Sequence, residues 1–217
     1  DWIILDLQHG AMNWETAYEC IHAALATGAR PLVRTSVGNP GEVEKALDLG
    51  AGGIVVPMVN SLEAATAVAR AAKYPPLGDR SLGGDNFLHH GADYFERANE
   101  ETLLLVQMEH IDAVNQAEEI MALPGVDGCF VGPVDLAISL GLSRHRGEYE
   151  QEPAQQAALK KIVNTTLAAG KIPCCNTYSL DDFAAQKTAG FQGITMKSDL
   201  DLLFDRGTNL LSELKEI

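Results

Sequence analysis

Short apolar runs alternate with helical patterns along almost the whole chain. The runs are rich in Val, Ile, Leu and Cys, a composition that is typical of buried parallel strands. They occupy residues 3–7, 31–35, 53–57, 102–109, 127–131, 172–176 and 193–196. This spacing predicts strands that are each separated from the next by room for at least one helix.

Capping signals between the runs mark where helices begin. Asn39 is followed by Pro40, the preferred order for an N-cap and a first helical residue. Ser61 precedes an apolar stripe of helical period that reaches about residue 72, and Ser179 precedes a similar segment. Residues 75–99 form a longer connection, in which we expect a short helix near residues 92–98. Strands and helices therefore alternate.

This alternation predicts a parallel sheet, and its repetition favours a (β/α)8 TIM barrel. Such a barrel spans about 250 residues, whereas this chain has 217 residues and starts inside a strand. We therefore predict a single barrel domain over residues 1–217, with its first βα unit missing from this chain. An open doubly wound sheet is the alternative, but no Gly-x-Gly-x-x-Gly or P-loop pattern follows any predicted strand.

Composition and charge exclude several classes of function. Hydrophobic residues make up 46% of the chain, and the formal net charge is −14. That charge argues against nucleic-acid binding, which needs clustered Lys and Arg. No apolar stretch approaches the roughly 20 residues of a membrane span. Cys129, Cys174 and Cys175 lie in strand-like runs and are expected to be reduced, which favours the cytoplasm.

Polar side chains fall at the ends of the predicted strands, where TIM-barrel active sites lie. They are Asp6, His9, Arg34, Gln107, Glu109 and Asp135. A buried strand has no structural use for a carboxylate at its tip, because an unpaired buried charge is costly. The convergence of these groups on one rim therefore predicts a catalytic site.

The polar residues after the first two strands have more than one interpretation. Asp6 either caps the turn after its strand or forms a dyad with His9, in which the carboxylate fixes the imidazole tautomer; we favour the dyad. Arg34 either pairs with a carboxylate or clamps an oxyanion of the substrate.

Glu109 and Asp135 end successive strands and form a candidate site for a hard cation. Carboxylate oxygens completed by water suit Mg²⁺ or Mn²⁺, and Co²⁺ can substitute. A catalytic zinc ion more often has His ligands beside the carboxylate. Gln107 lies two residues before Glu109, so both side chains are expected to point into the barrel.

Several segments match a known family in their order along the chain. They are residues 6–10, 32–34, 54–59, 74–80, 107–109 and 125–136. In these segments the chain resembles the HpcH/HpaI family of metal-dependent, class II pyruvate aldolases. The resemblance implies a barrel of the phosphoenolpyruvate/pyruvate type. It also implies an aldehyde-lyase that reversibly cleaves a 4-hydroxy-2-oxo acid to pyruvate and an aldehyde.

The resemblance also implies roles for individual residues. The metal ligands fall on Glu109 and Asp135, and the bound divalent metal would stabilise pyruvate enolate. The catalytic groups fall on His9, Asp6 and Arg34.

The pyruvate site falls on Gln107, Gly132, Pro133, Val134 and Asp135. Family members assemble as hexamers with exchanged C-terminal helices, so residues 200–214 are expected to pack on a neighbouring subunit.

The chain departs from the family pattern at two positions, and other functions stay open. Gln8 stands where Glu is more frequent, and Ser81 stands where Gly is usual. Both changes bear on the choice of aldehyde and not on the metal ligands. The alternatives are a citryl- or malyl-type lyase, an oxaloacetate decarboxylase and a non-catalytic barrel. Lys197 follows the last strand as a candidate for a Schiff-base mechanism, which we disfavour because it leaves the two carboxylates unexplained.

Overall fold

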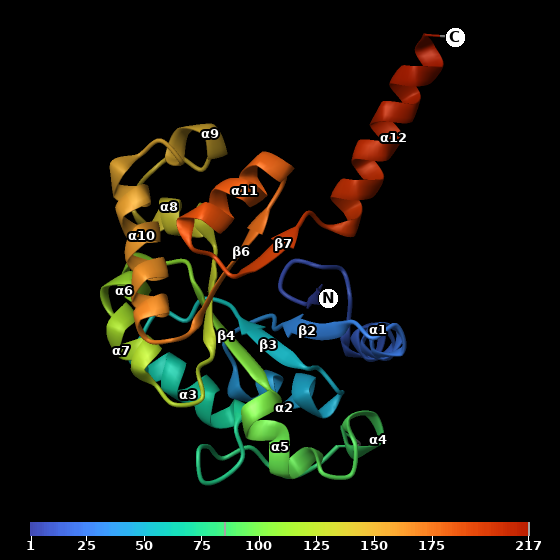
Figure 1. Cartoon of the computed structure of the whole chain (residues 1–217), viewed down its shortest axis with the longest axis vertical. Coiled ribbons are helices and arrows are strands. Elements are labelled where there is room, and N and C mark those ends of the chain that lie inside the picture. Colours follow the sequence, from blue (N-terminus) through green and yellow to red (C-terminus); the bar gives the residue numbers. More distant parts are fainter. Residues whose placement is uncertain (85, 217) are drawn as a thin grey trace.

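A single parallel sheet forms the frame of the protein (Figure 1). The computed structural model describes residues 1–84 and 86–216, without the side chains of Asn86 and Phe87. The strands are β1 (Trp2–Asp6), β2 (Arg30–Arg34), β3 (Gly53–Val56), β4 (Leu103–Met108), β5 (Gly128–Val131), β6 (Ile172–Thr177) and β7 (Gly193–Met196). They pair in chain order, each parallel to the next, so the predicted strands are confirmed to within one residue at each end.

Helices follow the strands and cover the outside of the sheet (Figure 1). They are α1 (Trp14–Ala26), α2 (Pro40–Asp48), α3 (Leu62–Ala72), α4 (Asn86–His90), α5 (Tyr94–Glu101), α6 (Ile111–Asn115), α7 (Ala117–Ala122), α8 (Pro133–Ser139), α9 (Arg146–Tyr149), α10 (Pro153–Ala168), α11 (Leu180–Ala189) and α12 (Asp199–Lys215). The predicted caps are confirmed, because Asn39, Ser61 and Ser179 each accept a backbone N–H from the first turn. The long connection after α3 contains both α4 and α5, where one helix was expected.

Apolar side chains pack on both faces of the sheet. The larger cluster lies between the sheet and the helices and includes Ile21, Leu47 and Ile120, which are fully buried. A smaller cluster fills the inside of the barrel and consists of Leu32, Val55, Leu105, Phe130 and Cys174. Each fully buried side chain of this size stabilises the fold by about 1.5–3 kcal/mol. Side chains alternate along a strand, so the residues two and four positions after Leu105 also face the barrel interior.

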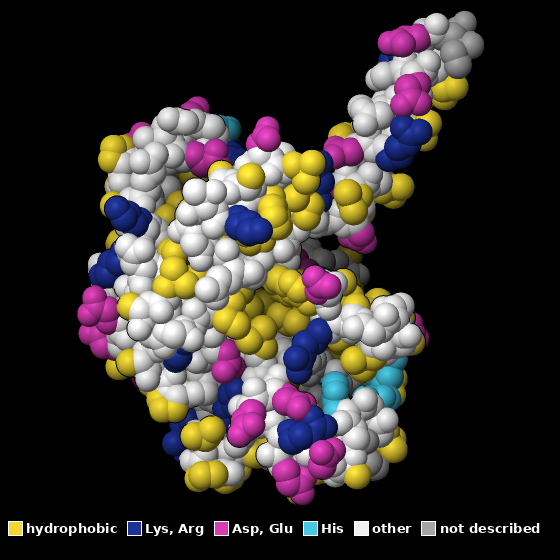
Figure 2. Space-filling view, viewed as in Figure 1, with side chains coloured by type: hydrophobic (Ala, Val, Ile, Leu, Met, Phe, Trp, Pro, Cys, Tyr) yellow, Lys and Arg dark blue, Asp and Glu magenta, His cyan; other side chains and the backbone are white. Residues whose placement is uncertain are grey.

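The sheet curves into a nearly closed barrel whose edges are β1 and β7. No ladder joins these two strands within residues 1–84 and 86–216. A cavity of about 330 Å³ is lined by residues of both edge strands, such as Trp2 and Gly193, and by residues of β2, β4 and β6, such as Leu32, Leu105 and Cys174. Figure 2 shows apolar side chains gathered at the centre of this face. Because all the strands are parallel, their C-terminal ends meet at a single rim.

Helix α12 leaves the barrel and projects from it as an isolated rod (Figure 1). None of its residues is buried. Even its large apolar side chains are exposed, and those of Leu200, Leu203 and Phe204 are between 72% and 75% exposed. In the part of the chain that the structure describes, no helix is long and apolar enough to cross a membrane.

Candidate active site

The ends of β1 and β2 place a carboxylate and a guanidinium side by side on the rim. Asp6 and Arg34 are the last residues of their strands and lie opposite each other in the strand register. The guanidinium donates from Nε to Oδ1 of Asp6 at 2.8 Å and from Nη2 to Oδ2 at 2.5 Å. This bidentate pair is partly buried, so it holds the Arg34 guanidinium in a fixed orientation.

The expected dyad between Asp6 and His9 is wrong in its geometry. The Asp6 carboxylate accepts the backbone N–H groups of Gln8 and His9, at 3.0 and 3.2 Å, together with the bonds from Arg34. The His9 side chain is exposed, and its imidazole makes no hydrogen bond among the described residues. The guanidinium binds the carboxylate because it offers two parallel donors from the adjacent strand, whereas His9 offers Asp6 its backbone N–H and not its imidazole.

These partners also explain the acidity of Asp6. Partial burial alone would raise the pKa of the Asp6 carboxyl. The hydrogen bonds and charge of Arg34, with the backbone N–H groups of His9 and Gln8, outweigh burial and hold that pKa below its usual value. Asp6 is therefore ionised at neutral pH and acts as a fixed anchor for Arg34.

Glu109 lies at the end of β4 and is only 1% exposed. Its Oε1 accepts the backbone N–H of Met58 at 2.7 Å, and its Oε2 accepts the side-chain amide of Gln107 at 2.5 Å. Gln107 is buried as well, and its own Oε1 has no hydrogen-bond partner among the described residues. The predicted inward direction of both side chains is thus confirmed. The carboxylate oxygens of Glu109 and the Oε1 of Gln107 lie together at the mouth of the barrel.

The pKa of the Glu109 carboxyl is raised above its usual value, chiefly because burial disfavours the charged form. The two hydrogen bonds from Met58 and Gln107 oppose this rise, whereas the charge of Asp135 adds to it and that of Arg34 lowers it. No Lys or Arg in residues 1–84 or 86–216 forms an ion pair with Glu109. A buried acid close to a second acid and without a cation is typical of a functional site.

Two features of the backbone hold Glu109 in position. Neither can be recognised from the polar residues at the strand ends. Met58 has a φ of 52°, in the left-handed region that residues other than glycine rarely adopt. In this conformation its backbone N–H points at the Glu109 carboxylate. Gly132 packs against the same carboxylate, where an added Cβ would lie 2.3 Å from Oε2 of Glu109 and 3.2 Å from Nε2 of Gln107. A glycine directly before the helix-starting Pro133 was the available signal for this close approach.

Asp135 lies in the first turn of α8, which begins at Pro133 directly after β5. Both Val134 and Asp135 are exposed, and Gly132 at the N-cap provides no side chain to cap the helix. The backbone N–H groups of the first helical turn have no partner within the helix, so this turn can bind an anion. The structure therefore brings Glu109, after β4, close to the segment that joins β5 to α8.

The donors at this rim fit a hard divalent cation. Glu109, directly after β4, and Asp135, in the first turn of α8, supply carboxylate oxygens, and their mutual repulsion is the electrostatic situation that a cation relieves. The buried, unpartnered Oε1 of Gln107 adds a neutral oxygen close by. Among the described residues no group of three or more His, Cys, Asp or Glu side chains converges, so substrate and water oxygens would complete the coordination.

Two cationic groups near the rim, Lys197 and Arg146, are already paired. The ammonium of Lys197, at the end of β7, forms an ion pair with Asp205 of α12. Arg146 pairs with Glu150 and Asp182 and lies over the Tyr178 ring, 4.7 Å from its centre. Neither group is a free cation, which weakens the Schiff-base alternative at Lys197.

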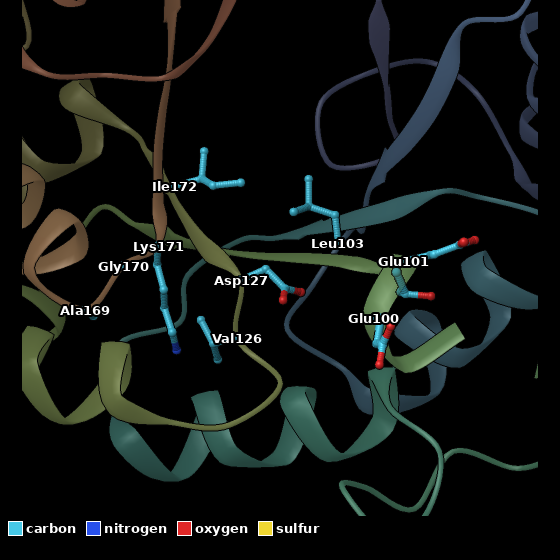
Figure 3. A pocket seen from close by; sticks show the side chains of 10 residues that line it. Glu100, Glu101, Leu103, Val126, Asp127, Ala169, Gly170, Lys171 and Ile172 are labelled. Atoms are coloured by element: carbon cyan, nitrogen blue, oxygen red, sulfur yellow. The ribbon is translucent and has the colours of Figure 1, made fainter. Parts of the chain in front are cut away.

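A cavity of about 390 Å³ lies at the opposite end of the barrel (Figure 3). The side chains of Glu100, Asp127 and Lys171 line it, at the N-terminal ends of β4, β5 and β6. In TIM barrels this end stabilises the fold, whereas the chemistry takes place at the C-terminal rim. The histidines of the long connection also lie away from the rim, because His90 bonds to the carbonyl of Gly50 before β3. His89 and His90 therefore do not line the entrance to the site.

Comparison with known families shows to which family this barrel belongs. A model described as HpcH/HpaI aldolase/citrate lyase matches residues 1–197. The chain belongs to this family.

Individual relatives agree with that placement. A hydroxypyruvate/pyruvate aldolase from Chromohalobacter salexigens is 34% identical over 99% of this chain and 85% of that protein. A 4-hydroxy-2-oxo-heptane-1,7-dioate aldolase from Klebsiella pneumoniae is 34% identical over 80% of this chain and 65% of its own length. The crystal structure of an HpcH/HpaI aldolase from Desulfitobacterium hafniense matches with a TM-score of 0.89 at 28% identity, covering 100% of this chain and 84% of that one.

These matches confirm three sequence-based expectations. The family resemblance is correct, and the fold is a TIM-like barrel. The protein is an enzyme of the carbon–carbon lyase class.

Proposed function

We propose that this protein catalyses the reversible aldol cleavage of a 4-hydroxy-2-oxo acid to pyruvate and an aldehyde. The observation that carries this proposal is the buried Glu109 carboxylate, whose pKa is raised by burial and by the nearby Asp135, at the rim of an aldolase-family barrel. The relatives named as pyruvate aldolases support the same reaction class.

Glu109 and Asp135 would hold a divalent cation, Mg²⁺ or Mn²⁺ with Co²⁺ as a substitute, because both offer hard oxygen ligands. When bound, the cation supplies Lewis acidity that stabilises negative charge on the enolate oxygen of pyruvate. Gln107 and the backbone of Met58 hold the Glu109 carboxylate in place through hydrogen bonds to its two oxygens. Each carboxylate oxygen keeps a free lone pair after these bonds.

Arg34 contributes positive charge at the 2-oxo oxygen of the substrate. Its guanidinium has five N–H donors, of which the pair with Asp6 uses two. The remaining donors are free to bind the oxygen on which charge develops as the carbon–carbon bond breaks. Asp6 is thus a positioning residue for Arg34.

His9 is the proposed general base for the C4 hydroxyl. Its imidazole is exposed on the turn after β1, where a substrate lying across the rim can reach it. Removal of the hydroxyl proton by the ring nitrogen lets the C3–C4 bond break, which releases the aldehyde and leaves the electron pair in pyruvate enolate. Return of a proton to C3 then gives pyruvate.

The substrate carboxylate is proposed to bind at the segment from Gly132 to Asp135. The N–H groups of Val134 and Asp135 lie in the first turn of α8, at the positive end of its dipole. Pro133 starts the helix, and Gly132 leaves space beside Gln107, whose free Oε1 can accept a hydrogen bond from substrate or water.

We also propose a cytoplasmic hexamer. The cysteines Cys20, Cys129, Cys174 and Cys175 are all free, as expected in a reducing compartment. The exposed leucines of α12 support packing on a second copy of the chain. Light scattering tests this, because Leu203→Glu should reduce the particle mass, whereas Glu213→Gln on the same helix should not. An unchanged mass in Leu203→Glu would exclude α12 from the contact.

A pyruvate-release assay tests the proposed reaction directly. The substrate panel contains 4-hydroxy-2-oxo acids, oxaloacetate and citryl- and malyl-thioesters, each with and without added Mg²⁺, Mn²⁺ or Co²⁺. We expect pyruvate from the hydroxy-oxo acids, loss of activity in EDTA and its recovery with the metal. Unchanged activity in EDTA together with borohydride trapping of a pyruvate adduct would contradict the metal mechanism and assign the chemistry to a lysine.

A further inference from the structure

Two histidines from distant segments meet on the outside of the barrel, away from the catalytic rim. His22 lies on α1, and His89 lies on α4 in the long connection before β4. Their Nε2 atoms are 2.8 Å apart. An added Cβ on Gly50, three residues before the start of β3, would lie 3.7 Å from the His89 ring, which places the pair near the N-terminal ends of the strands.

The tautomer of His22 is set by a backbone carbonyl. Its Nδ1 lies 2.7 Å from the carbonyl oxygen of Tyr18, which can only accept a hydrogen bond. Nδ1 therefore carries the proton, and the neutral ring presents a lone pair at Nε2, toward His89. Histidines that bind metals usually donate their other ring N–H to a carbonyl or a carboxylate in this way.

The contact between the two Nε2 atoms has the distance of a hydrogen bond, but the two rings are not collinear. If one Nε2–H pointed directly along the lone pair of the other Nε2, the ring centres would lie about 5 Å apart. They are only 4.2 Å apart, with their planes inclined at 73°. The nitrogens thus approach each other obliquely, as they do when both face a third atom.

We propose that His22 and His89 form a two-imidazole binding site for a divalent transition-metal ion of tetragonal geometry, Cu²⁺ or Ni²⁺. Two nitrogens 2.8 Å apart, each about 2.0 Å from one ion, subtend an angle of about 90° at that ion. This is the angle between neighbouring ligands in tetragonal Cu²⁺ and Ni²⁺ complexes, whereas a tetrahedral Zn²⁺ would hold them about 3.3 Å apart.

The surroundings of the pair fit such an ion. His89 is exposed and His22 is partly exposed, so water can fill the remaining coordination positions. No third His, Cys, Asp or Glu joins them among the described residues, which leaves an open site. The formal net charge of −14 favours the approach of cations. The site bridges α1 and α4 and is independent of the chemistry proposed at the rim.

Titration of the untagged full chain with Cu²⁺, followed by pulsed electron paramagnetic resonance, tests the site. The wild type is expected to bind a Cu²⁺ ion that shows coupling to two imidazole nitrogens. His22→Ala and His89→Ala should each lose one imidazole and weaken binding at least tenfold. The matched control His145→Ala, at an exposed histidine, should leave both the signal and the affinity unchanged.

The rim is tested in the same experiment, because Glu109→Gln should keep the two-imidazole signal if the copper binds at the histidine pair. Persistence of both imidazoles in either His22→Ala or His89→Ala would overturn the proposal. So would a wild-type Cu²⁺ affinity equal to that of His22→Ala or of His89→Ala. Circular dichroism confirms that each variant is folded, and the two single variants give independent results.

Discussion

The two ends of the barrel both bury charged side chains, but they satisfy them differently. At the N-terminal end, the ammonium of Lys73 donates to the carbonyls of Asn99 and Thr102 at 2.9 and 2.7 Å and to Asp127 at 3.1 Å. At the C-terminal rim, Glu109 is equally buried but has a second acid nearby and no cation paired with it in the described chain. Burial is therefore common to both ends, and the balance of charge distinguishes them.

Arg80 extends the contrast at the N-terminal end. Its guanidinium bonds to Asp48 and to the hydroxyl of Tyr94, both at 3.0 Å, and lies over the ring of Tyr74. These contacts fix the long connection after α3 against α2 and α5. An end whose buried charges are neutralised stabilises the fold, whereas an end with an uncompensated acid is prepared for a ligand.

The largest expected effect on stability follows the loss of the buried cation. Lys73→Met removes the ammonium and leaves Asp127 and two carbonyls without their partner, so the free energy of unfolding should fall by about 3 kcal/mol. Urea denaturation measures this change. Lys160→Met, on the exposed face of α10, should change stability by less than about 0.5 kcal/mol. Equal effects of the two substitutions would show that the buried Lys73 ammonium does not stabilise the N-terminal end of the barrel.

At the rim, Arg34→Lys should impair chemistry more than stability. Lysine keeps the charge but cannot donate two parallel bonds to Asp6, so kcat/KM should fall by about 10²-fold. Arg70→Lys is the matched control, because Arg70 makes the same bidentate contact with Asp79 but lies exposed on α3. Full activity in Arg34→Lys would show that the guanidinium geometry does not matter.

A smaller effect on the same chemistry is expected from Gly132→Ala. The new methyl group would lie 2.3 Å from Oε2 of Glu109, so the carboxylate must move away from its position. Activity should fall by about tenfold, and the affinity for Mn²⁺ should fall with it. Gly147→Ala, whose added methyl meets nothing within 4 Å, should retain wild-type activity. Unimpaired metal binding in Gly132→Ala would refute the role of this glycine.

The smallest effect concerns pH and the N-terminal end. Burial lowers the pKa of His90 below 6.5, although its bond to the Gly50 carbonyl partly opposes this. The folded protein thus favours the neutral ring, and its contribution to stability is present above pH 6.5 and is lost as the pH falls through the lower folded pKa.

Melting temperatures between pH 7.5 and pH 5 measure this contribution. His90→Gln should lose less stability on acidification than the wild type, whereas the exposed His145→Gln should follow the wild type. Identical pH profiles for His90→Gln and the wild type would show that the His90 ring does not titrate with unfolding.

The strands and their rim residues could be predicted from the sequence because they depend on local patterns. Apolar runs, Gly-terminated helices and caps such as Ser61 repeat with a fixed spacing, and a parallel sheet then brings every strand end to the same rim. The partners of individual side chains could not be predicted in this way. Asp6 pairs with Arg34 rather than with the His9 imidazole because the register of β1 and β2 places the guanidinium opposite it.

The groups that hold the Glu109 carboxylate could not be predicted from sequence patterns either. The N–H of Met58 reaches the carboxylate through a left-handed backbone conformation that no residue preference signals. The burial of Lys73 was equally hidden, because its acceptors come from Asn99, Thr102 and Asp127, which are far apart in the chain. Such partners become apparent only when the distant segments are assembled.

Titration calorimetry with Mn²⁺ tests the central claim most directly. The wild type should bind one ion at the rim, and Glu109→Gln should weaken that binding at least tenfold while pyruvate release falls by about 10²-fold or more. Glu118→Gln, an exposed carboxylate on the neighbouring helix α7, should match the wild type in both measurements. Wild-type Mn²⁺ affinity together with full pyruvate release in Glu109→Gln would contradict the account.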